Sequence, residues 1–109
     1  MKTILRLDLI LAACLSFAAL AAGAPDSPDG AALFKQKCSM CHGADGKGFA
    51  ALKTPDFTDP KWQASRTDKE IASTIKNGKQ GTMMQAFGSQ LKDEDIDALV
   101  KQIRSLKKQ

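Results

Sequence analysis

The last part of the chain carries apolar residues at helical spacing. Between residues 93 and 108 the apolar positions are Ile96, Leu99, Val100, Ile103 and Leu106. Such a pattern places apolar side chains on one face of an α-helix. Carboxylates at 93–95 and basic side chains at 104, 107 and 108 suit the two ends of a helix dipole. We therefore expect a C-terminal amphipathic helix.

A second helix is predicted between residues 67 and 78. Thr67 and Glu70 have the spacing of a capping box, in which each side chain binds the backbone N–H of the other residue. Ile71 and Ile75 follow on one face, and Asn77-Gly78 is typical of a helix C-terminus. These signals give the helix a defined beginning and end.

A third helix is predicted from Ser27, as its cap, and Pro28, at its first position. It carries Phe34 towards Cys38, and Gly43 breaks it. A short turn is expected near residues 59–62, and the sequence contains no convincing strand pattern and no internal repeat. The sequence thus predicts an all-α fold with three main helices and a short fourth.

The first 24 residues differ in composition from the rest of the chain. Lys2 and Arg6 give a positive start, residues 9–22 are almost wholly apolar, and small residues follow. This arrangement is typical of a secretory signal peptide with cleavage after Ala21 or Ala24, which leaves residues 25–109 as one domain. The apolar run is short for a membrane span. We therefore predict an exported, periplasmic protein.

Residues 11–14 offer an alternative route of N-terminal processing. This Leu-Ala-Ala-Cys segment resembles a bacterial lipoprotein box, in which Cys14 would be acylated and become the first residue. Arg6 and Asp8 interrupt the apolar stretch before Cys14 and argue against this interpretation. Membrane contact is expected only if Cys14 carries lipid, and otherwise we expect a soluble monomer.

The chemistry of the chain is concentrated in Cys38-Ser39-Met40-Cys41-His42. A Cys-x-x-Cys-His segment is typical of covalent haem attachment. Cysteines three residues apart lie on the same side of a helical turn, so both sulfurs can reach the two vinyl groups along one edge of a porphyrin. The imidazole that follows can then bind the iron. The motif predicts one haem c, bound through Cys38 and Cys41, with His42 as an iron ligand.

Three other uses of the two cysteines fit the sequence less well. Thiol–disulfide oxidoreductases carry such a pair beside a βαβ pattern, which this chain lacks. A zinc site would need a second pair of ligands, but His42 is the only histidine and Cys14 lies far upstream. A structural disulfide gives no reason for a histidine directly after Cys41.

Size and charge add two constraints. A domain of residues 25–109 with few aromatic side chains has little core to bury, and a covalent haem would supply a large apolar disc. Without residues 1–24 the chain keeps 14 basic and 11 acidic side chains. Lysines 35, 37, 47, 53 and 79 either steer an acidic redox partner or form a solvated surface. Nothing indicates nucleic-acid binding.

A methionine is the natural second ligand of the iron because the chain has one histidine. Met40 lies inside the attachment motif, and Met1 would leave with the signal peptide. Met83 and Met84 remain, adjacent to each other between two predicted helices. Either can bend over the far face of the haem, or both can fill gaps in the core.

The mature chain resembles a class I c-type cytochrome over essentially its whole length. The matching segments are residues 38–43, Thr-Pro-Asp-Phe at 54–57, Asn77-Gly78, Met-Gln-Ala-Phe at 84–87, Leu91 and the closing helix. Their order and spacing are similar to those of the small bacterial members with a single haem. The resemblance implies a cytochrome c-like fold wrapped around the haem.

The resemblance assigns further residues to the cofactor. In the family, the methionine three residues before the position of Phe87 binds iron, which selects Met84 over Met83. Pro55 is expected to offer its backbone carbonyl to the imidazole, which would fix the ring and raise its donor strength. Trp62 either lies near a haem propionate or fills the core.

The family pattern also implies packing between the first and last helices through Gly30 and Phe34. Three residues depart from it. Gln85 stands where a proline is usual, which leaves the methionine loop less rigid. Gln102 replaces an aromatic residue in the last helix, and Lys92 replaces the Ser or Thr cap before it.

These features favour a single-electron carrier over an enzyme. Histidine and methionine ligands raise the potential of a haem, and we expect electron exchange with a membrane oxidase, reductase or dehydrogenase. A peroxidase-like or gas-binding protein would need an open distal side, and the sequence offers no distal histidine or arginine placed to cleave peroxide. Two free thiols without haem would instead indicate a thiol oxidoreductase.

Overall fold

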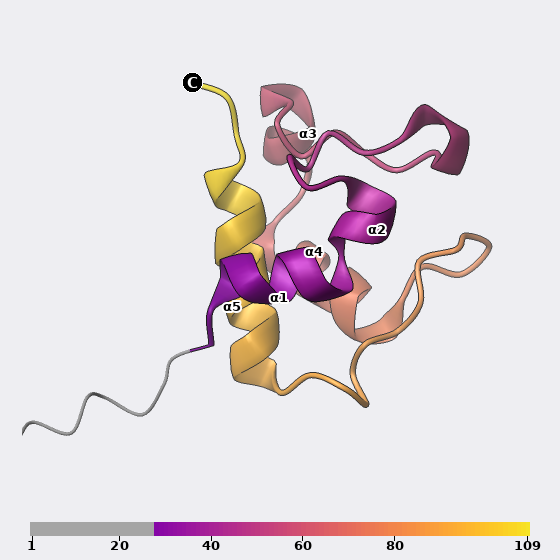
Figure 1. Ribbon diagram of the computed structural model, residues 1–109, viewed down its shortest axis with the longest axis vertical. Coiled ribbons are helices and arrows are strands. Elements are labelled where there is room, and N and C mark those ends of the chain that lie inside the picture. The colour runs from indigo at the N-terminus through magenta and orange to yellow at the C-terminus, as the bar shows by residue number, and fades with distance from the viewer. Residues whose placement is uncertain (1–27) are drawn as a thin grey trace, which may run out of the picture.

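The computed structural model describes residues 28–109, so the predicted signal peptide and Cys14 lie outside the described residues. The helices are α1 Gly30–Lys37, α2 Ser39–His42, α3 Pro60–Ser65, α4 Asp68–Asn77 and α5 Asp93–Ser105, with a 3₁₀ helix, η1 Ala50–Leu52, between α2 and α3. Residues 28–109 contain no strand. The predicted all-α fold is confirmed, with α1, α4 and α5 as its main helices (Figure 1).

Helix α5 supplies the largest share of the core. Its buried residues are Ile96, Leu99, Val100 and Ile103, and Leu99 has no exposed surface. The other core side chains come from α1, α4 and the connecting segments: Phe34, Ile71, Ile75, Phe57, Phe87 and Leu91. The apolar face predicted for the C-terminal helix is therefore the face that the fold buries.

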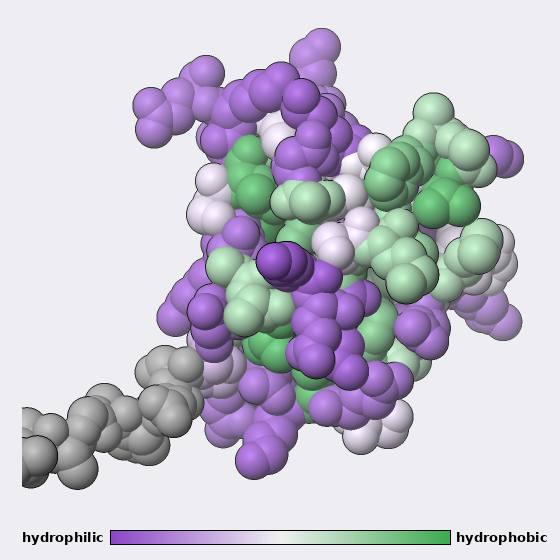
Figure 2. Space-filling view, in the orientation of Figure 1, coloured by the Kyte–Doolittle hydropathy of each residue, from purple (hydrophilic) through white to green (hydrophobic). Residues whose placement is uncertain are grey.

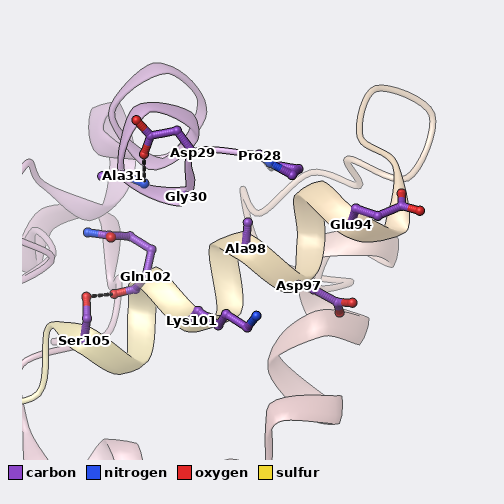
Figure 3. A pocket seen from close by; sticks show the side chains of 10 residues that line it. All are labelled: Pro28, Asp29, Gly30, Ala31, Glu94, Asp97, Ala98, Lys101, Gln102 and Ser105. Atoms are coloured by element: carbon purple, nitrogen blue, oxygen red, sulfur yellow. Dashed lines mark hydrogen bonds between the residues drawn. The ribbon is translucent and has the colours of Figure 1, made fainter. Parts of the chain in front are cut away.

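Helix α1 crosses α5 closely at Gly30 (Figure 1). A Cβ atom at Gly30 would lie 2.3 Å from the Ala98 carbonyl oxygen and 3.2 Å from the Gln102 Cβ atom. Figure 3 shows the shallow groove between the two helices, with Gly30 on one wall and Ala98 and Gln102 on the other. A side chain at Gly30 would push the helices apart, so the predicted packing of the first helix on the last depends on this glycine.

The beginning of α1 differs from the prediction. Its N-cap is Asp29, whose carboxylate accepts hydrogen bonds from the N–H groups of Ala31 and Ala32 at 3.0 and 3.2 Å. The prediction of Ser27 as the cap and Pro28 as the first helical residue is wrong. Asp29 already satisfies two of the free N–H groups at the helix start, so no cap from an earlier residue is needed.

Helix α4 begins and ends as predicted. The Thr67 hydroxyl accepts from the Glu70 N–H at 3.1 Å, the Glu70 carboxylate accepts from the Thr67 N–H at 2.8 Å, and Gly78 ends the helix with a φ of +72°. Helix α5 begins without a side-chain cap from Lys92. The Asp95 carboxylate instead accepts from the Lys92 N–H at 2.9 Å.

A polar network joins α3 to α5. Gln63 is buried, and its amide donates to the carbonyls of Phe57 and Ile103 at 2.7 and 2.9 Å. The Arg104 guanidinium donates to the backbone and side-chain oxygens of Gln63 at 2.6 and 2.8 Å, and to the Asp68 carboxylate at 2.7 Å. A satisfied buried network of this kind rigidifies the contact it spans.

Candidate functional site

Helix α2 is a single turn that carries most of the Cys-x-x-Cys-His motif. The N–H groups of Cys41 and His42 both donate to the Cys38 carbonyl, at 3.2 and 2.9 Å, while the Cys38 N–H donates to the Phe34 carbonyl at 2.9 Å. Cys38 therefore ends α1 and starts α2, whereas the sequence predicted one helix up to Gly43. The turn keeps both sulfurs on one short element, as covalent attachment to a porphyrin edge requires.

Both cysteine side chains of the motif are half-buried. Burial, and secondarily the neighbouring Cys41, raise the pKa of the Cys38 thiol to about 11. A raised pKa favours the protonated thiol over the thiolate. Residues 28–109 contain no group of three or more His, Cys, Asp or Glu side chains that could hold a metal ion.

The imidazole of His42 has a fixed orientation. It stacks on the ring of Phe57, with ring centroids 4.7 Å apart and an angle of 20° between the planes. Its Nδ1 atom is buried and has no hydrogen-bond partner within the described range. Burial also lowers the pKa of His42, which favours the neutral imidazole. Neutral imidazole is the form that binds metals, so the ring fits the role of an iron ligand.

Pro55 lies in a segment that folds back on α2. The Gly48 N–H donates to the His42 carbonyl at 2.8 Å, and a Cβ atom at Gly48 would lie 2.7 Å from the Pro55 carbonyl oxygen. This close approach, and a φ of +73°, require glycine at position 48. The His42 Nδ1 atom has no hydrogen-bond partner within residues 28–109, so the expected bond to the Pro55 carbonyl is absent from this structure.

Trp62 packs on Phe57, the residue whose ring also stacks on His42. Its ring lies 4.7 Å from the Phe57 ring, at an interplanar angle of 49°, and the side chain is half-buried against the core. Helix α3, which begins with the Asp59 carboxylate accepting from the Lys61 N–H at 2.9 Å, holds Trp62 in this position. Trp62 thus packs against the core, and part of the indole remains exposed.

The two candidate methionines lie in different environments. Met83 is 78% exposed, whereas Met84 is half-buried and packs against the hydrophobic core. The turn that carries them is closed by a hydrogen bond from the Lys79 N–H to the Met84 carbonyl at 3.0 Å. Of the two methionines, Met84 is the one that faces the core.

The sequence did not reveal two residues that shape the site. Phe57 stood out only as part of the segment 54–57, yet it is the ring that stacks on His42. Thr82 had no assigned role, yet its hydroxyl accepts a hydrogen bond from the Met84 N–H at 3.2 Å. The position of Thr82, two residues before Met84, is a signal of a local side-chain turn that could have identified it.

Large apolar side chains are exposed near the motif. Met40 is 87% exposed. Phe49, which precedes η1, is 46% exposed, and Leu52, within η1, is 37% exposed. Figure 2 shows apolar surface gathered on the side of the molecule where Figure 1 places α2 and η1. Lys47 and Lys53 flank η1, and both are exposed. The region thus combines apolar and positively charged surface.

Comparison with known proteins places the chain in a family. Residues 25–103 match the family model described as cytochrome c oxidase, cbb3-type, subunit III. The chain is 35% identical over 82 residues to the cbb3-type cytochrome c oxidase subunit FixP of Azorhizobium caulinodans, a match that covers 75% of this chain and 28% of FixP. It is 32% identical over 77 residues to subunit CcoP of Rubrivivax gelatinosus, covering 71% of this chain and 25% of CcoP. The chain thus spans about a quarter of the length of these curated relatives.

Solved structures with a similar fold include c-type cytochromes. The c-type cytochrome KustC0563 is 37% identical, with a TM-score of 0.69, and the match covers 73% of this chain and 99% of that protein. Cytochrome cL from Hyphomicrobium denitrificans is 31% identical, with a TM-score of 0.63, and the match covers 75% of this chain and 48% of the cytochrome. Within residues 28–109, no helix has the length and apolar character needed to cross a membrane.

The matches agree with the arrangement of the motif. The paired half-buried cysteines and the half-buried imidazole of His42 fit a covalently bound haem c, and the predicted resemblance to a class I c-type cytochrome is confirmed. Haem c is therefore the cofactor, and electron transfer is the function of this type of domain. The chain belongs to the family of cytochrome c oxidase, cbb3-type, subunit III.

Proposed function

We propose that the protein is a single-electron carrier, and not an enzyme, whose haem is held by Cys38, Cys41, His42 and Met84. Cys38 and Cys41 would bind the porphyrin covalently, and His42 and Met84 would be the protein ligands of its iron. When bound, the haem supplies an iron that alternates between the ferrous and ferric states. Histidine and methionine ligands together raise the potential, so we expect a positive midpoint.

The observation that carries this proposal is the difference between Met83 and Met84. Met84 packs against the core, whereas Met83 is directed largely into solvent. A soft thioether that is already ordered beside an apolar core can bind iron without a large loss of conformational entropy. This difference supports Met84 as the second protein ligand of the iron.

Pro55 and Trp62 are proposed to complete the surroundings of the haem. A buried Nδ1–H without a partner costs free energy, and the buried Nδ1 of His42 therefore supports a hydrogen bond to the Pro55 carbonyl once haem is attached. Such a bond would fix the tautomer of the ring and strengthen its donation to iron. The exposed part of the Trp62 indole is a candidate donor to a haem propionate.

Optical spectra of the haem-loaded protein test the ligand assignment. We expect a narrow reduced band of c-type haem and a weak far-red methionine–iron band in the oxidised protein. Met84→Ala should abolish the far-red band, and the matched control Met83→Ala should retain it. Loss of the band in Met83→Ala alone would assign the ligand to Met83. A wild-type high-spin spectrum without the band would contradict the carrier proposal and favour ligand binding or catalysis.

A membrane oxidase is the partner that the comparisons favour, because the relatives are named as subunits of cbb3-type oxidases. We propose that an acidic redox partner docks on the apolar residues Phe49 and Leu52 through the flanking Lys47 and Lys53. Weak electron-transfer encounters use small interfaces, and opposite charges accelerate their formation. A surface that combines two exposed apolar side chains with two lysines suits such an encounter.

The docking proposal is tested by the rate of electron exchange with the oxidase at several ionic strengths. Lys47→Gln combined with Lys53→Gln should lower the rate by about tenfold at low salt and reduce its salt dependence. Lys101→Gln, on exposed α5 surface away from η1, is the matched control and should leave the rate unchanged. A wild-type rate that does not respond to ionic strength would contradict steering by these lysines.

Export is proposed from the N-terminal composition. Residues 1–24 would act as a signal peptide, and the mature domain would work in the periplasm as a free monomer. The intact mass of the exported protein distinguishes the routes, since cleavage after Ala21, cleavage after Ala24 and acylation of Cys14 give different products. A lipid-bearing Cys14 would replace the free carrier with a membrane-tethered one.

A further inference from the structure

The turn that carries Met84 is organised by one hydroxyl group. Thr82 Oγ1 donates to the Lys79 carbonyl at 2.7 Å and accepts from the Met84 N–H at 3.2 Å. The Lys79 N–H donates to the Met84 carbonyl at 3.0 Å, and the Thr82 N–H donates to the Lys79 carbonyl at 3.2 Å. Both backbone polar groups of Met84 are therefore fixed by the turn 79–84.

The turn formed by residues 79–84 is also held against the end of α4. A Cβ atom at Gly78 would lie 2.8 Å from the Met84 carbonyl oxygen, so the chain passes directly over this glycine. After the turn, the Phe87 N–H donates to the Ile75 carbonyl at 2.9 Å, and the Gly88 N–H donates to the Lys76 carbonyl at 3.0 Å. Helix α4 thus fixes both ends of the turn, while Thr82 fixes its interior.

The residue after Met84, Gln85, makes the hydrogen bond from the Met84 N–H to the Thr82 hydroxyl more important. Gln85 is exposed, and its N–H makes no backbone hydrogen bond within residues 28–109. A proline at this position would restrict the backbone next to Met84, whereas glutamine imposes no such restriction. The backbone around Met84 therefore depends on hydrogen bonds from outside position 85, and the Thr82 hydroxyl is the side-chain group that supplies them.

We infer that Thr82 is a positioning residue that holds the Met84 sulfur on the iron and compensates for the absence of a proline at position 85. The inference rests on the proposed ligation by Met84. Loss of the hydroxyl would leave the Met84 N–H to water and the Lys79 carbonyl with the Thr82 N–H as its one remaining donor in the turn, which would let the turn open. The iron–methionine bond would then be displaced more easily by an added ligand, while the rest of the fold, to which exposed Thr82 contributes little, would stay intact.

Titration of the oxidised, haem-loaded protein with imidazole tests this inference, with loss of the far-red methionine–iron band as the readout. Thr82→Val removes the hydroxyl and keeps the shape, and we expect imidazole to displace the methionine at about tenfold lower concentration. Thr82→Ser keeps the hydroxyl and should stay within about twofold of the wild type. Adding Gln85→Pro to Thr82→Val should restore the wild-type value, because the proline would replace the missing restriction.

The outcomes separate this inference from the ligand assignment. A far-red band that persists in Met84→Ala would overturn the ligation on which the inference depends. If Met84→Ala abolishes the band but Thr82→Val titrates like the wild type, the positioning role of Thr82 is wrong. A Thr82→Val protein with a lower unfolding midpoint in guanidinium but an unchanged imidazole titration would show a merely structural role, and would also overturn the inference.

Discussion

The ring of Phe57 stacks on the imidazole of His42, with centroids 4.7 Å apart and planes inclined by 20°. Phe57 is itself held from two other sides. Phe34 meets it edge-on at 6.2 Å, and Trp62 lies against it at 4.7 Å. The orientation of the imidazole is therefore determined by the core and not by the motif alone. This arrangement links the packing of α1 and α3 to the proposed ligand of the haem iron.

Replacing Phe57 tests this link. Phe57→Leu would keep an apolar core but remove the flat surface beneath the imidazole, and we expect a loss of about 1–2 kcal/mol in the free energy of unfolding. The freer imidazole should also change the midpoint potential of the haem, because ligand orientation tunes the iron. Guanidinium unfolding and a redox titration measure the two effects.

Phe49→Leu is the control for Phe57→Leu. Phe49 is exposed, so its replacement should change the free energy of unfolding by less than about 0.5 kcal/mol and leave the potential unchanged. An identical potential in Phe57→Leu and the wild type would show that the stacked ring does not orient the ligand.

The contact between α1 and α5 predicts an unusual response to alanine. In most helices alanine is favoured over glycine by about 1 kcal/mol. At Gly30, however, the added carbon would lie 2.3 Å from the Ala98 carbonyl oxygen, and the helices would have to separate. We expect Gly30→Ala to destabilise the protein by about 1–3 kcal/mol, as overpacking does. The urea midpoint measures this effect, with exposed Gln36→Ala on the same helix as a neutral control. A more stable Gly30→Ala protein would contradict the close crossing.

The network between α3 and α5 predicts a contrast between buried and exposed polar contacts. Gln63→Leu would remove a donor from the carbonyls of Phe57 and Ile103 and an acceptor from Arg104, and the Phe57 carbonyl would lose the one donor it has within residues 28–109. Because a buried unpaired group costs about 1–3 kcal/mol, and two further hydrogen bonds are lost with it, we expect a loss of more than about 2 kcal/mol in the free energy of unfolding.

An exposed ion pair provides the comparison for Gln63→Leu. Lys76 and Asp93 form a salt bridge of 3.2 Å, and both side chains are largely exposed. Lys76→Met should therefore cost less than about 1 kcal/mol. Equal losses for the two variants in thermal or urea unfolding would mean that the Gln63 network is as weak as a surface contact.

The parts of this structure that sequence reasoning could predict are the ones that depend on neighbouring residues. Thr67 and Glu70 cap α4 through bonds within one turn, and the spacing of Cys38 and Cys41 carries the attachment chemistry in itself. The stacking of Phe57 on His42 could not be predicted, because it depends on how distant segments pack in the core.

Adjacent residues with the same chemistry mark another limit of the sequence. Met83 and Met84 differ in burial because the hydrogen bonds of the turn direct one side chain to the core and the other to solvent. The break between α1 and α2 at Cys38 is a comparable case. The residues around it suit a continuous helix, and the change of direction appears only where α2 leaves α1.

Asp56 gives a prediction for acid stability. Its carboxylate accepts hydrogen bonds from the hydroxyl and the N–H of Thr58, at 2.6 and 2.8 Å, and these bonds hold the pKa of Asp56 below its ordinary value of 3.8. A folded-state pKa below that of the unfolded chain means that the ionised carboxylate stabilises the fold. This stabilisation is complete above the ordinary pKa and disappears as the pH falls through the lower folded-state pKa.

Asp56→Asn should therefore be less stable than the wild type at pH 7, and the two proteins should converge as the pH falls below about 3.8. Thr58→Val, which removes the hydroxyl donor, should weaken the acid dependence, while Thr58→Ser should keep it because the donor remains. Urea midpoints measured from pH 7 to pH 3 test all three variants. Parallel curves for Asp56→Asn and the wild type over this range would show that the Thr58 hydrogen bonds do not favour the ionised carboxylate, since only a difference in proton binding between the folded and unfolded states can make the curves converge.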